Sequence, residues 1–350
     1  MIAASIKLNT TKVMKVSVII LNWNGKALME EFLPSVVANT PSDIAEVIVA
    51  DNGSTDDSIA MLNVKFPSVR IITLDQNYGF AEGYNKAISL TDATYTVLLN
   101  SDVEVSPGWL EAPLAVLDKE SSVAAIQPKI RAQRNKDYFE YAGAAGGFMD
   151  IYGYPYCRGR ILSVVEKDCG QYDTQTDILW ATGACLFIRT DVYKKEGGLD
   201  ARFFAHQEEI DMCWRLRSRG YRIVCTPKSV VYHVGGATLN TESPHKTFLN
   251  FRNNLLMLYK NLPEQDLRRT FRARFWFDFI AASKFFLTGH PKNASAIYRA
   301  RREFKQLKKE YAVIRKENIR KTTCVHIPEI RRKSLLASFF LKGIRLFSDL

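Results

Sequence analysis

The sequence predicts an α/β protein with a mainly parallel sheet flanked by helices, followed by a helical C-terminal region. Over about the first 130 residues, short apolar runs alternate with amphipathic segments, as in βαβ units. Each of four apolar runs in this part gives way to Asn, Asp or Gly at its carboxyl end. After about residue 250 the pattern changes to long, basic segments with helical character.

Four segments of the N-terminal part are predicted strands, because they are short, apolar and mostly β-branched. They are 16–21, 46–50, 69–74 and 95–99. The intervening segments carry apolar residues at helical spacing and are predicted helices at 26–39, 57–66 and 81–90. Since strands and helices alternate, the strands should run parallel in one sheet.

The next part of the chain predicts shorter elements. Residues 131–180 are rich in Gly, Ala and Tyr, which is typical of loops with short strands. Further strands are expected at 184–189 and 230–233. A helix is expected at 208–219, because Gly220 provides a C-terminal stop.

Charge is distributed unevenly. The last 100 residues contain 23 Lys and Arg against 8 Asp and Glu, a net charge of +15, whereas the first 250 carry −4. Such a basic region attracts phosphate, either of nucleic acid or of anionic lipid. The segment 271–287 mixes aromatic and basic residues, which suits a helix lying in a membrane interface. The alternative is that these helices pack on the rest of the protein with a basic face in solvent.

The sequence favours a cytoplasmic protein. It has no run of about 18 uninterrupted apolar residues that would predict a membrane span. The apolar run 16–21 is too short for a signal peptide. The six cysteines form no Cys-x-x-Cys pair, which argues against a structural zinc site and for a reducing compartment. Whether Met1 or Met14 is the natural start stays open.

The polar residues at the strand ends predict a ligand site, because ligands of open α/β sheets bind beyond the carboxyl ends of the strands. These pairs are Asn22/Gly25, Asp51/Gly53, Asn77/Gly79 and Asn100/Asp102. The alternative is that they are ordinary turn residues. An oxygen ligand at the fourth strand end would suit a hard divalent cation that also binds substrate phosphates.

Three acids, Glu208, Glu209 and Asp211, begin the helix at 208–219, where the helix dipole also favours carboxylates. His233 ends an apolar strand, and a lone His in that position is more often a core residue than a metal ligand. A position of His233 close to Asp102 would favour a metal ligand over a core residue.

Five motifs occur in a fixed order along the chain. They are VSVIILNWN at 16–24, DNGSTD at 51–56, NYGFA at 77–81, LNSD at 99–102 and EEIDMCWR at 208–215. As an ordered set they resemble the family 2 glycosyltransferases, which have the GT-A fold, a Rossmann-like fold of nucleotide-diphospho-sugar transferases. They are most similar to the rhamnosyltransferase-like enzymes of bacterial surface-polysaccharide biosynthesis. The resemblance covers roughly residues 14–260.

The resemblance implies a donor site at the strand ends. Asn22, Trp23 and Asp51 would hold the base and ribose of a nucleotide-diphosphate sugar. Asp56 and Asn77 would support that pocket. Trp180 and Gly183 fall in the segment that usually lines the acceptor side.

The resemblance also implies a metal site. Asp102 is the last position of the family's Asp-x-Asp motif and would coordinate Mg²⁺ or Mn²⁺ at the donor diphosphate, with His233 as a further ligand. Asn100 stands in place of the first Asp, so that ligand would be an uncharged amide oxygen.

Glu209 occupies the position of the family's catalytic base, where Asp is commoner. Asp211 and then Glu208 are the alternatives for this role. The base would take the proton of the acceptor hydroxyl as its oxygen attacks the anomeric carbon.

The activity implied is inverting sugar transfer from a UDP- or dTDP-sugar to a saccharide acceptor, expected to be lipid-linked, in cell-surface polysaccharide biosynthesis. Residues 14–250 would form the catalytic domain. Residues 251–350 would form a basic amphipathic helical region, which would hold the protein on the inner face of the membrane. No nucleic-acid partner is expected.

Three other classes of protein share some of these features. A sugar-1-phosphate nucleotidyltransferase would show a glycine-rich loop with a basic residue after the first strand, where this chain has Asn22 to Gly25. A dehydrogenase would have Gly-x-Gly-x-x-Gly there, and the chain has none. A non-enzymatic nucleic-acid- or lipid-binding protein would fit the basic region, but no known nucleic-acid motif occurs.

Overall fold

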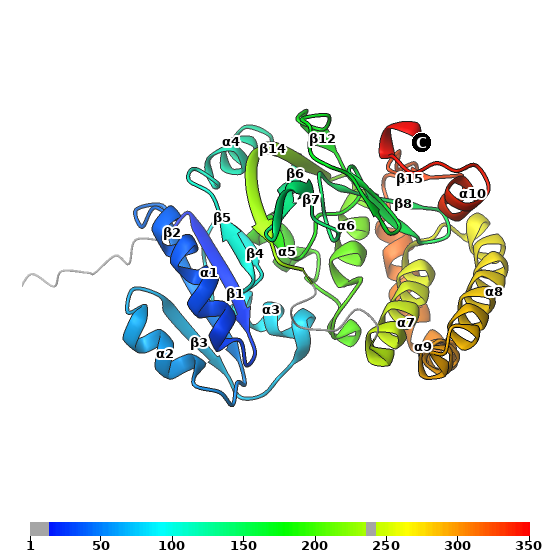
Figure 1. Ribbon diagram of the computed structural model, residues 1–350, viewed down its shortest axis with the longest axis horizontal. Coiled ribbons are helices and arrows are strands. Elements are labelled where there is room, and N and C mark those ends of the chain that lie inside the picture. Colours follow the sequence, from blue (N-terminus) through cyan, green and yellow to red (C-terminus); the bar gives the residue numbers. More distant parts are fainter. Residues whose placement is uncertain (1–13, 236–242) are drawn as a thin grey trace, which may run out of the picture.

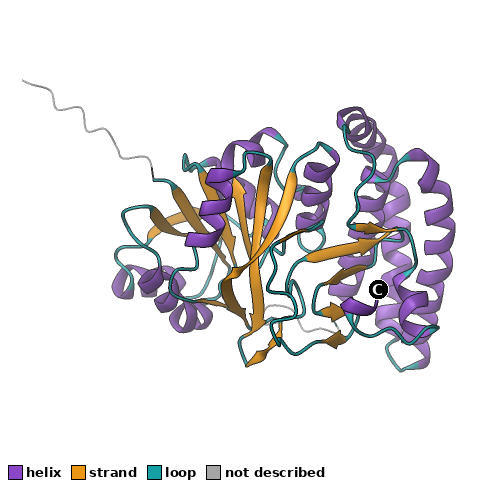
Figure 2. Cartoon of the chain, turned by 90° about the horizontal axis from the view of Figure 1, so that it is seen from above, coloured by secondary structure: helices purple, strands orange, loops and turns teal. Residues whose placement is uncertain are grey.

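The fold is an α/β layer structure with a helical C-terminal region, as the sequence predicts (Figures 1 and 2). The computed structural model describes residues 14–235 and 243–350, so Met1 lies outside the described residues. A ten-stranded mixed sheet forms the centre, and a five-stranded sheet lies beside it. The long helices that follow gather at one end of the molecule (Figure 2).

The N-terminal half of the large sheet is parallel, in the order β3-β2-β1-β4. The strands are β1 (Val16–Asn22), β2 (Ala45–Asn52), β3 (Arg70–Leu74) and β4 (Tyr95–Leu99). The crossover helices are α1 (Lys26–Asn39), α2 (Ser58–Lys65) and α3 (Gly79–Ser89). All seven predicted elements are therefore present, and the parallel arrangement is confirmed.

The other half of the sheet is mixed. Strand β13 (Cys185–Arg189) runs antiparallel between β4 and β6 (Val123–Ala132), and β14 (Arg222–His233) runs parallel to β6. Smaller strands complete it: β5 (Val103–Val105), β7 (Asn135–Phe139) and β12 (Thr176–Asp177). The strand predicted at 230–233 is the last part of the longer β14, which a register shift after Thr226 interrupts.

Helices α4 (Glu111–Lys119), α5 (Thr190–Lys195) and α6 (Glu208–Ser218) belong to this half, and a 3₁₀ turn (Ala201–Phe203) precedes α6. The five-stranded sheet consists of β8 (Gly147–Asp150), β9 (Pro155–Cys157), β10 (Arg160–Ile161), β11 (Val164–Val165) and β15 (Ile330–Arg331). Four of these strands lie in the segment predicted as loops with short strands.

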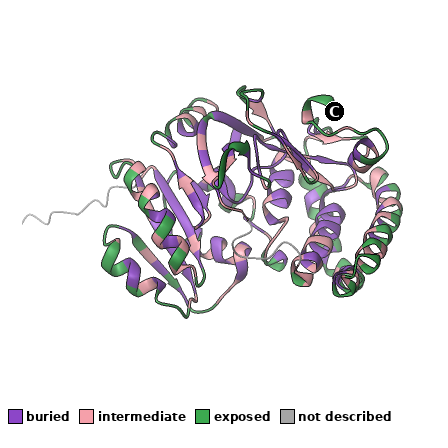
Figure 3. Cartoon of the chain, in the orientation of Figure 1, coloured by how far each residue is buried: buried purple, intermediate pink, exposed green. Residues whose placement is uncertain are grey.

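Successive side chains of the strands point to opposite faces of the large sheet, and most of them are buried on both faces (Figure 3). Val18 and Ile20 of β1 belong to one apolar cluster with Met29 of α1. The intervening Ile19 belongs to a second cluster with Tyr84 of α3. Since β1 is buried on both faces, its run of β-branched residues is what a central parallel strand requires.

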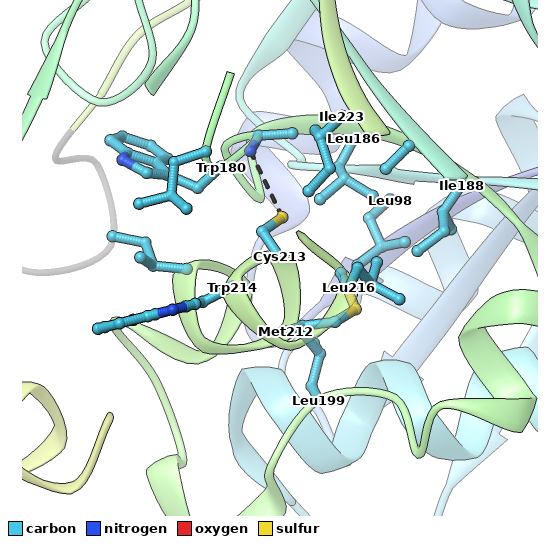
Figure 4. Packing of buried hydrophobic residues seen from close by; sticks show 14 of the residues in the cluster. Leu98, Trp180, Leu186, Ile188, Leu199, Met212, Cys213, Trp214, Leu216 and Ile223 are labelled. Carbon is cyan, nitrogen blue, oxygen red and sulfur yellow. Dashed lines mark hydrogen bonds between the residues drawn. The ribbon is translucent and has the colours of Figure 1, made fainter. Parts of the chain in front are cut away.

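Helix α6 packs on the middle of the sheet. Met212, Cys213 and Leu216 lie among side chains of β4, β13 and β14 (Figure 4). The backbone N–H of Ala181 donates a hydrogen bond to Cys213 Sγ, with 3.5 Å between nitrogen and sulfur. Those strand side chains are Leu98, Leu186, Ile188 and Ile223. This packing fixes where the acidic first turn of α6 lies.

The C-terminal region contains α7 (Pro244–Asn261), α8 (Glu264–Leu287), α9 (Pro291–Lys321), α10 (Leu335–Phe340) and a final 3₁₀ turn (Phe347–Asp349). Helix α7 is buried over most of its length and shares the apolar cluster of α6. The domain boundary expected at residue 250 falls within α7. Among the described residues, no helix combines the length and the apolar character needed to cross a bilayer.

Candidate active site

The carboxyl ends of β1 and β2 are joined by hydrogen bonds between side chains. Asn22 Nδ2 donates to Asp51 Oδ1 at 3.0 Å and to Ser54 Oγ at 3.1 Å. Asn22 Oδ1 is buried and has no hydrogen-bond partner among the described residues. A Cβ at Gly25 would lie 2.5 Å from that oxygen, so glycine keeps the space beside it open. An open space next to a buried, unpaired acceptor suits a ligand N–H.

The turns that follow β1 and β2 interlock. Asn24 has a φ of +51° and accepts the Thr55 backbone N–H at 2.7 Å through Oδ1. Its own N–H donates to Ser54 Oγ at 2.9 Å. Between them Trp23 is half exposed, at 50%. An exposed indole held on a fixed turn offers a flat surface on which a base can stack.

Asp56 and Asn77 stabilise the backbone around these turns. Asp56 accepts the N–H groups of Lys26 and Ser58, the first residues of α1 and α2, each at 3.1 Å. Burial opposes ionisation of Asp56, but these bonds and the Ser58 hydroxyl hold its pKa below the usual value. Asn77 Oδ1 accepts the Gly79 N–H at 2.8 Å and Asn52 Nδ2 at 3.1 Å. Both side chains thus have the geometry of supporting residues.

Asp102 and His233 lie together. Asp102 Oδ1 is 3.1 Å from His233 Nε2, and Asn100 Nδ2 is 3.3 Å from the same nitrogen. The pairing of β5 with β14 sets Val103 opposite His233, which brings the end of β14 beside the turn after β4. On the other side, Glu140 Oε2 lies 3.5 Å from His233 Nδ1.

The charges around His233 dominate its titration. Burial disfavours the imidazolium, but the Asp102 and Glu140 carboxylates outweigh burial and raise the pKa of His233 to about 10. His233 is therefore more than a core histidine with one satisfied hydrogen bond, because it lies between two buried carboxylates.

The donor set at Asp102 fits a divalent cation that is shared with a substrate. The described residues contain no cluster of three or more His, Cys, Asp or Glu side chains that would hold a metal ion unaided. Mg²⁺ and Mn²⁺ are usually bound by one or two protein groups together with substrate phosphates. Asp102 and His233 supply two such groups, His233 once its proton is released on binding of the cation, and the Asn100 amide lies beside them.

The first turn of α6 carries two carboxylates in an apolar environment. Glu208 is buried, and Glu209 is partly exposed, but the Oε2 atom of each is out of contact with solvent and has no hydrogen-bond partner in the part of the chain that the structure describes. Burial raises the pKa of Glu209 to about 7, and burial together with the charge of Glu209 raises that of Glu208 further. A carboxylate that has a raised pKa and one oxygen free to accept a proton is a good candidate for a general base.

Asp211 differs from its two neighbours. It is fully buried and accepts hydrogen bonds from Lys260 at 2.8 Å, Asn261 at 2.8 Å and Arg215 at 3.0 Å. Burial opposes its ionisation, but Lys260 and Arg215 hold the pKa of Asp211 below its usual value. These contacts tie α6 to α7 and use the lone pairs that a catalytic base needs.

The loop before α6 has an unusual backbone. Phe204, His206 and Gln207 have φ values of +63°, +71° and +73°, a region that non-glycine residues seldom adopt and that costs about 1–3 kcal/mol per residue. The Phe204 carbonyl accepts the N–H groups of Phe80 at 2.7 Å and of Ala81 at 3.2 Å. The loop is therefore attached to the first turn of α3, next to the strand ends described above.

Helix α7 holds this loop from the other side. Asn253 Nδ2 donates to the carbonyls of Phe203, Ala205 and His206 at 2.8–2.9 Å. Arg252 Nη2 donates to the Arg202 carbonyl at 2.9 Å. Asn254 Nδ2 donates to Gln207 Oε1 at 3.2 Å and to Gly153 O at 2.7 Å. Three consecutive side chains of α7 thus fix the backbone that leads into Glu208.

We expect Asn253→Ala to lower the free energy of unfolding by about 1–3 kcal/mol, because its buried amide would no longer pair with loop carbonyls. Urea denaturation measures the change. Asn63→Ala, at an exposed position of α2, is the control and should change stability by less than about 0.5 kcal/mol. Equal effects of the two substitutions would show that the loop does not depend on Asn253.

The segment expected on the acceptor side lies between these groups. The Asn100 N–H donates to the Ala184 carbonyl at 3.0 Å. A Cβ at Gly183 would come within 2.8 Å of the Phe80 ring, so glycine permits this approach. Trp180 is buried, and its Nε1 donates to the Phe148 carbonyl at 2.9 Å. Continuous contacts therefore connect the Asp102 turn, through this segment and Phe80, to the loop before Glu209.

A separate cavity of about 180 Å³ lies between α6, the turn after α7 and the chain that follows α9. Its lining includes Trp214, Pro263, His326 and Ile330. None of the residues expected to bind donor, metal or acceptor lines it.

Fold and site together define a class of protein: the GT-A glycosyltransferases. The crystal structure of GalNAc-T7 with UDP, GalNAc and Mn²⁺ superposes with a TM-score of 0.59 at 15% identity, over 86% of this chain and 56% of that one. The crystal structure of S. aureus TarS 1–349 with UDP-GlcNAc gives a TM-score of 0.54 at 17% identity, over 88% of this chain and 89% of that one. At these identities the likeness establishes the fold.

Residues 17–195, just over half of the chain, match the family model "Glycosyl transferase family 2", and the chain belongs to this family of enzymes that use nucleotide sugars. The N-acetylglucosaminyl-diphospho-decaprenol L-rhamnosyltransferase of Mycobacterium tuberculosis is 26% identical over 223 residues, covering 59% of this chain and 71% of the relative. The O-antigen biosynthesis protein RfbC of Myxococcus xanthus is 25% identical over 232 residues, which are 65% of this chain but only 18% of that protein.

Sequence reasoning missed two parts of the site. Glu140, beside His233, lies in a Gly- and Tyr-rich segment where nothing marks it. The polar run Arg252, Asn253 and Asn254 does carry a signal, because it directly precedes the four apolar residues 255–258 of the same helix. Buried polar side chains in such a position require specific partners, and here the partners are the carbonyls of the α6 loop.

Proposed function

We propose that this protein is a metal-dependent, inverting glycosyltransferase that moves a sugar from a UDP- or dTDP-sugar to a saccharide acceptor. The main observations that support this are the Asp102–His233 pair at the sheet edge and the Glu209 Oε2 atom, which is buried without a hydrogen-bond partner among the described residues. Contacts through Phe80 and Phe204 connect these two groups.

The donor nucleotide would bind at the ends of β1 and β2. The unpaired Asn22 Oδ1 offers an acceptor for an N–H of the base, and Asp51 holds the Asn22 amide in place. The half-exposed Trp23 offers a stacking surface. Asp56 and Asn77 support these turns through their backbone hydrogen bonds.

Asp102 and His233, with Asn100 beside them, would hold Mg²⁺ or Mn²⁺ at the donor diphosphate. A cation bound there neutralises the negative charge that the leaving nucleoside diphosphate develops. Glu209 would accept the proton of the acceptor hydroxyl while its oxygen attacks the anomeric carbon from the face opposite the diphosphate.

The rhamnosyltransferase relative, whose name specifies a diphospho-decaprenol acceptor, supports a lipid-linked acceptor for this chain. The O-antigen relative supports a role in cell-surface polysaccharide biosynthesis. Work on such an acceptor would place the protein at the inner face of the cytoplasmic membrane.

The base must be ionised, so activity should depend on pH. Because burial raises the pKa of Glu209 to about 7, the ionised fraction decreases as the pH falls through 7. We expect kcat to reach a plateau above about pH 8 and to fall about tenfold per unit below pH 7. Initial rates from pH 5 to 9 at saturating donor, acceptor and Mn²⁺ measure this. A flat profile between pH 6 and 8 would contradict the assignment of Glu209.

Product analysis tests the reaction itself. The full chain is incubated with UDP- and dTDP-sugars, Mn²⁺ and a prenyl-diphosphate saccharide, and the products are identified by mass spectrometry and NMR. We expect a nucleoside diphosphate and an elongated acceptor whose new linkage has the anomeric configuration opposite to that of the donor. A nucleotidyltransferase would instead consume a nucleoside triphosphate and a sugar 1-phosphate and release pyrophosphate, and that result would overturn the proposal.

A further inference from the structure

Six large apolar side chains lie exposed along one face of α8, at 51–83% of their full accessibility. They are Phe275, Trp276, Phe279, Ile280, Phe286 and Leu287, and together they are called the α8 ridge below. Their sequence positions differ by intervals such as three, four and eleven, which bring side chains to the same side of a helix. Figure 3 shows α8 at the edge of the molecule, farthest from β3, with much of its surface exposed.

The opposite face of α8 is fixed to the protein. Arg274 and Asp278 are buried and paired, with Arg274 Nη2 and Asp278 Oδ1 at 2.9 Å, and Arg274 Nη1 donates to the Tyr152 carbonyl at 3.0 Å. Arg301 of α9 also binds Asp278. Turning α8 to bury the ridge would break the hydrogen bond from Arg274 to Tyr152 and the ion pair of Asp278 with Arg301, so the ridge stays outward.

Three aromatic rings of the ridge form one group. The rings of Phe275 and Trp276 have centroids 5.3 Å apart, and those of Trp276 and Phe279 are 6.3 Å apart. Scattered apolar residues are normal on protein surfaces, but a contiguous group of this size marks a contact surface.

The surrounding charge indicates what this surface contacts. Arg268, Arg269, Arg272 and Lys284 of α8 are exposed, and the last 100 residues carry a net charge of +15. Aromatic residues beside basic ones are typical of helices in the interface of an anionic bilayer, where each Lys or Arg contributes about fivefold to binding. We propose that the α8 ridge docks this protein on an anionic lipid surface, with α8 lying in the plane of the interface.

The length of the ridge agrees with this orientation. Twelve residues separate its first and last members, which is about 18 Å of helix, well below the thickness of a bilayer core. The docked helix is also connected to the site. Arg274 binds Asn254, and Asn254 binds Gln207, the residue before Glu208. Docking would therefore set the orientation of the site relative to the membrane.

Vesicle sedimentation tests the proposal with the full chain. The variant Trp276→Ser/Phe279→Ser/Ile280→Ser removes the centre of the ridge. Vesicles of phosphatidylcholine with 30% phosphatidylglycerol are compared with phosphatidylcholine alone. We expect the unchanged protein to bind the anionic vesicles, and the triple variant to bind at least about tenfold more weakly. Equal binding of the two proteins, or no binding of the unchanged protein, would overturn the proposal.

A matched control removes three exposed apolar side chains from the sheet half, Val64→Ser/Leu90→Ser/Tyr138→Ser. It should bind the vesicles like the unchanged protein, and a loss equal to that of the ridge variant would also contradict the proposal. Trp276→Phe provides a second measurement, because this substitution keeps the ridge apolar. Quenching of tryptophan fluorescence by brominated lipid should decrease in Trp276→Phe while its binding persists.

A second copy of the chain is the other occupant that such a ridge could have. Sedimentation velocity without lipid distinguishes membrane docking from dimer formation. A dimer that the triple serine variant converts to a monomer would overturn membrane docking, whereas a monomer for both proteins agrees with it. None of these measurements uses sugar transfer, so their outcome is independent of the proposed activity.

Discussion

Glu209→Gln should lower kcat by about 10²–10⁴-fold and leave donor binding unchanged. The amide has the size of the carboxylate but cannot take a proton, and among the described residues Glu209 Oε2 has no hydrogen-bond partner that the substitution would disturb. Steady-state kinetics measures the first effect. Stabilisation against heat by the nucleoside diphosphate measures the second.

Glu208→Gln is the matched control, because Glu208 precedes Glu209 on α6 and its Oε2 atom, like that of Glu209, is buried without a partner among the described residues. Its kcat should stay within about tenfold of the unchanged protein. If Glu208→Gln were the inactive variant and Glu209→Gln the active one, the role of base would pass to Glu208. Near-normal kcat in both would show that neither carboxylate is the base.

Asp102→Ala should reduce metal-dependent turnover by about 10³-fold or more, since the charge compensation of a bound cation contributes several kcal/mol to such reactions. Asp102→Asn keeps the shape of the side chain and should show a similar loss, because the anionic ligand is what the cation requires. In both variants Mn²⁺ should no longer raise the melting temperature in the presence of the nucleoside diphosphate.

The control for these variants is Asp92→Asn, at an exposed position before β4, which should keep full activity and full stabilisation by Mn²⁺. Wild-type turnover of Asp102→Asn at low Mn²⁺ would contradict the assigned ligand. Loss of activity with Mn²⁺ stabilisation intact would mean that Asp102 acts on the substrate rather than through the metal.

The parallel half of the fold could be predicted closely from the sequence. The helix expected at 26–39 and the strand expected at 95–99 have the bounds of α1 and β4. Apolar periodicity is sufficient there, because one side of each helix and both faces of β1, β2 and β4 are largely buried.

Strand β6 was not predicted, because Gln127, Pro128 and Lys129 interrupt its apolar run. In the structure Gln127 Nε2 donates to the Gly143 carbonyl at 3.0 Å, and Lys129 pairs with Asp168 at 2.9 Å. Both side chains are buried with partners that lie far away along the chain. Local patterns carry no information on such partners.

The candidate site likewise has one part that could be predicted from the sequence and one part that could not. The order of polar residues at strand ends predicted that Asn22, Asp51 and Asp102 would belong to one sheet edge, and β-sheet pairing brings His233 to Asp102. Nothing local distinguishes Glu209 from Asp211, two positions apart on one helix. Their difference comes from Lys260 and neighbouring residues of α7, which pair with Asp211 and leave Glu209 unpaired.

The family match ends at residue 195, whereas the α7 side chains that hold the loop before α6 lie beyond residue 250. A homologue could keep every motif inside the match and have lost Asn253. Such a chain would still bind its donor but would lack a rigid support for its base. Genome surveys that count motifs alone would then classify a pseudoenzyme as an active transferase.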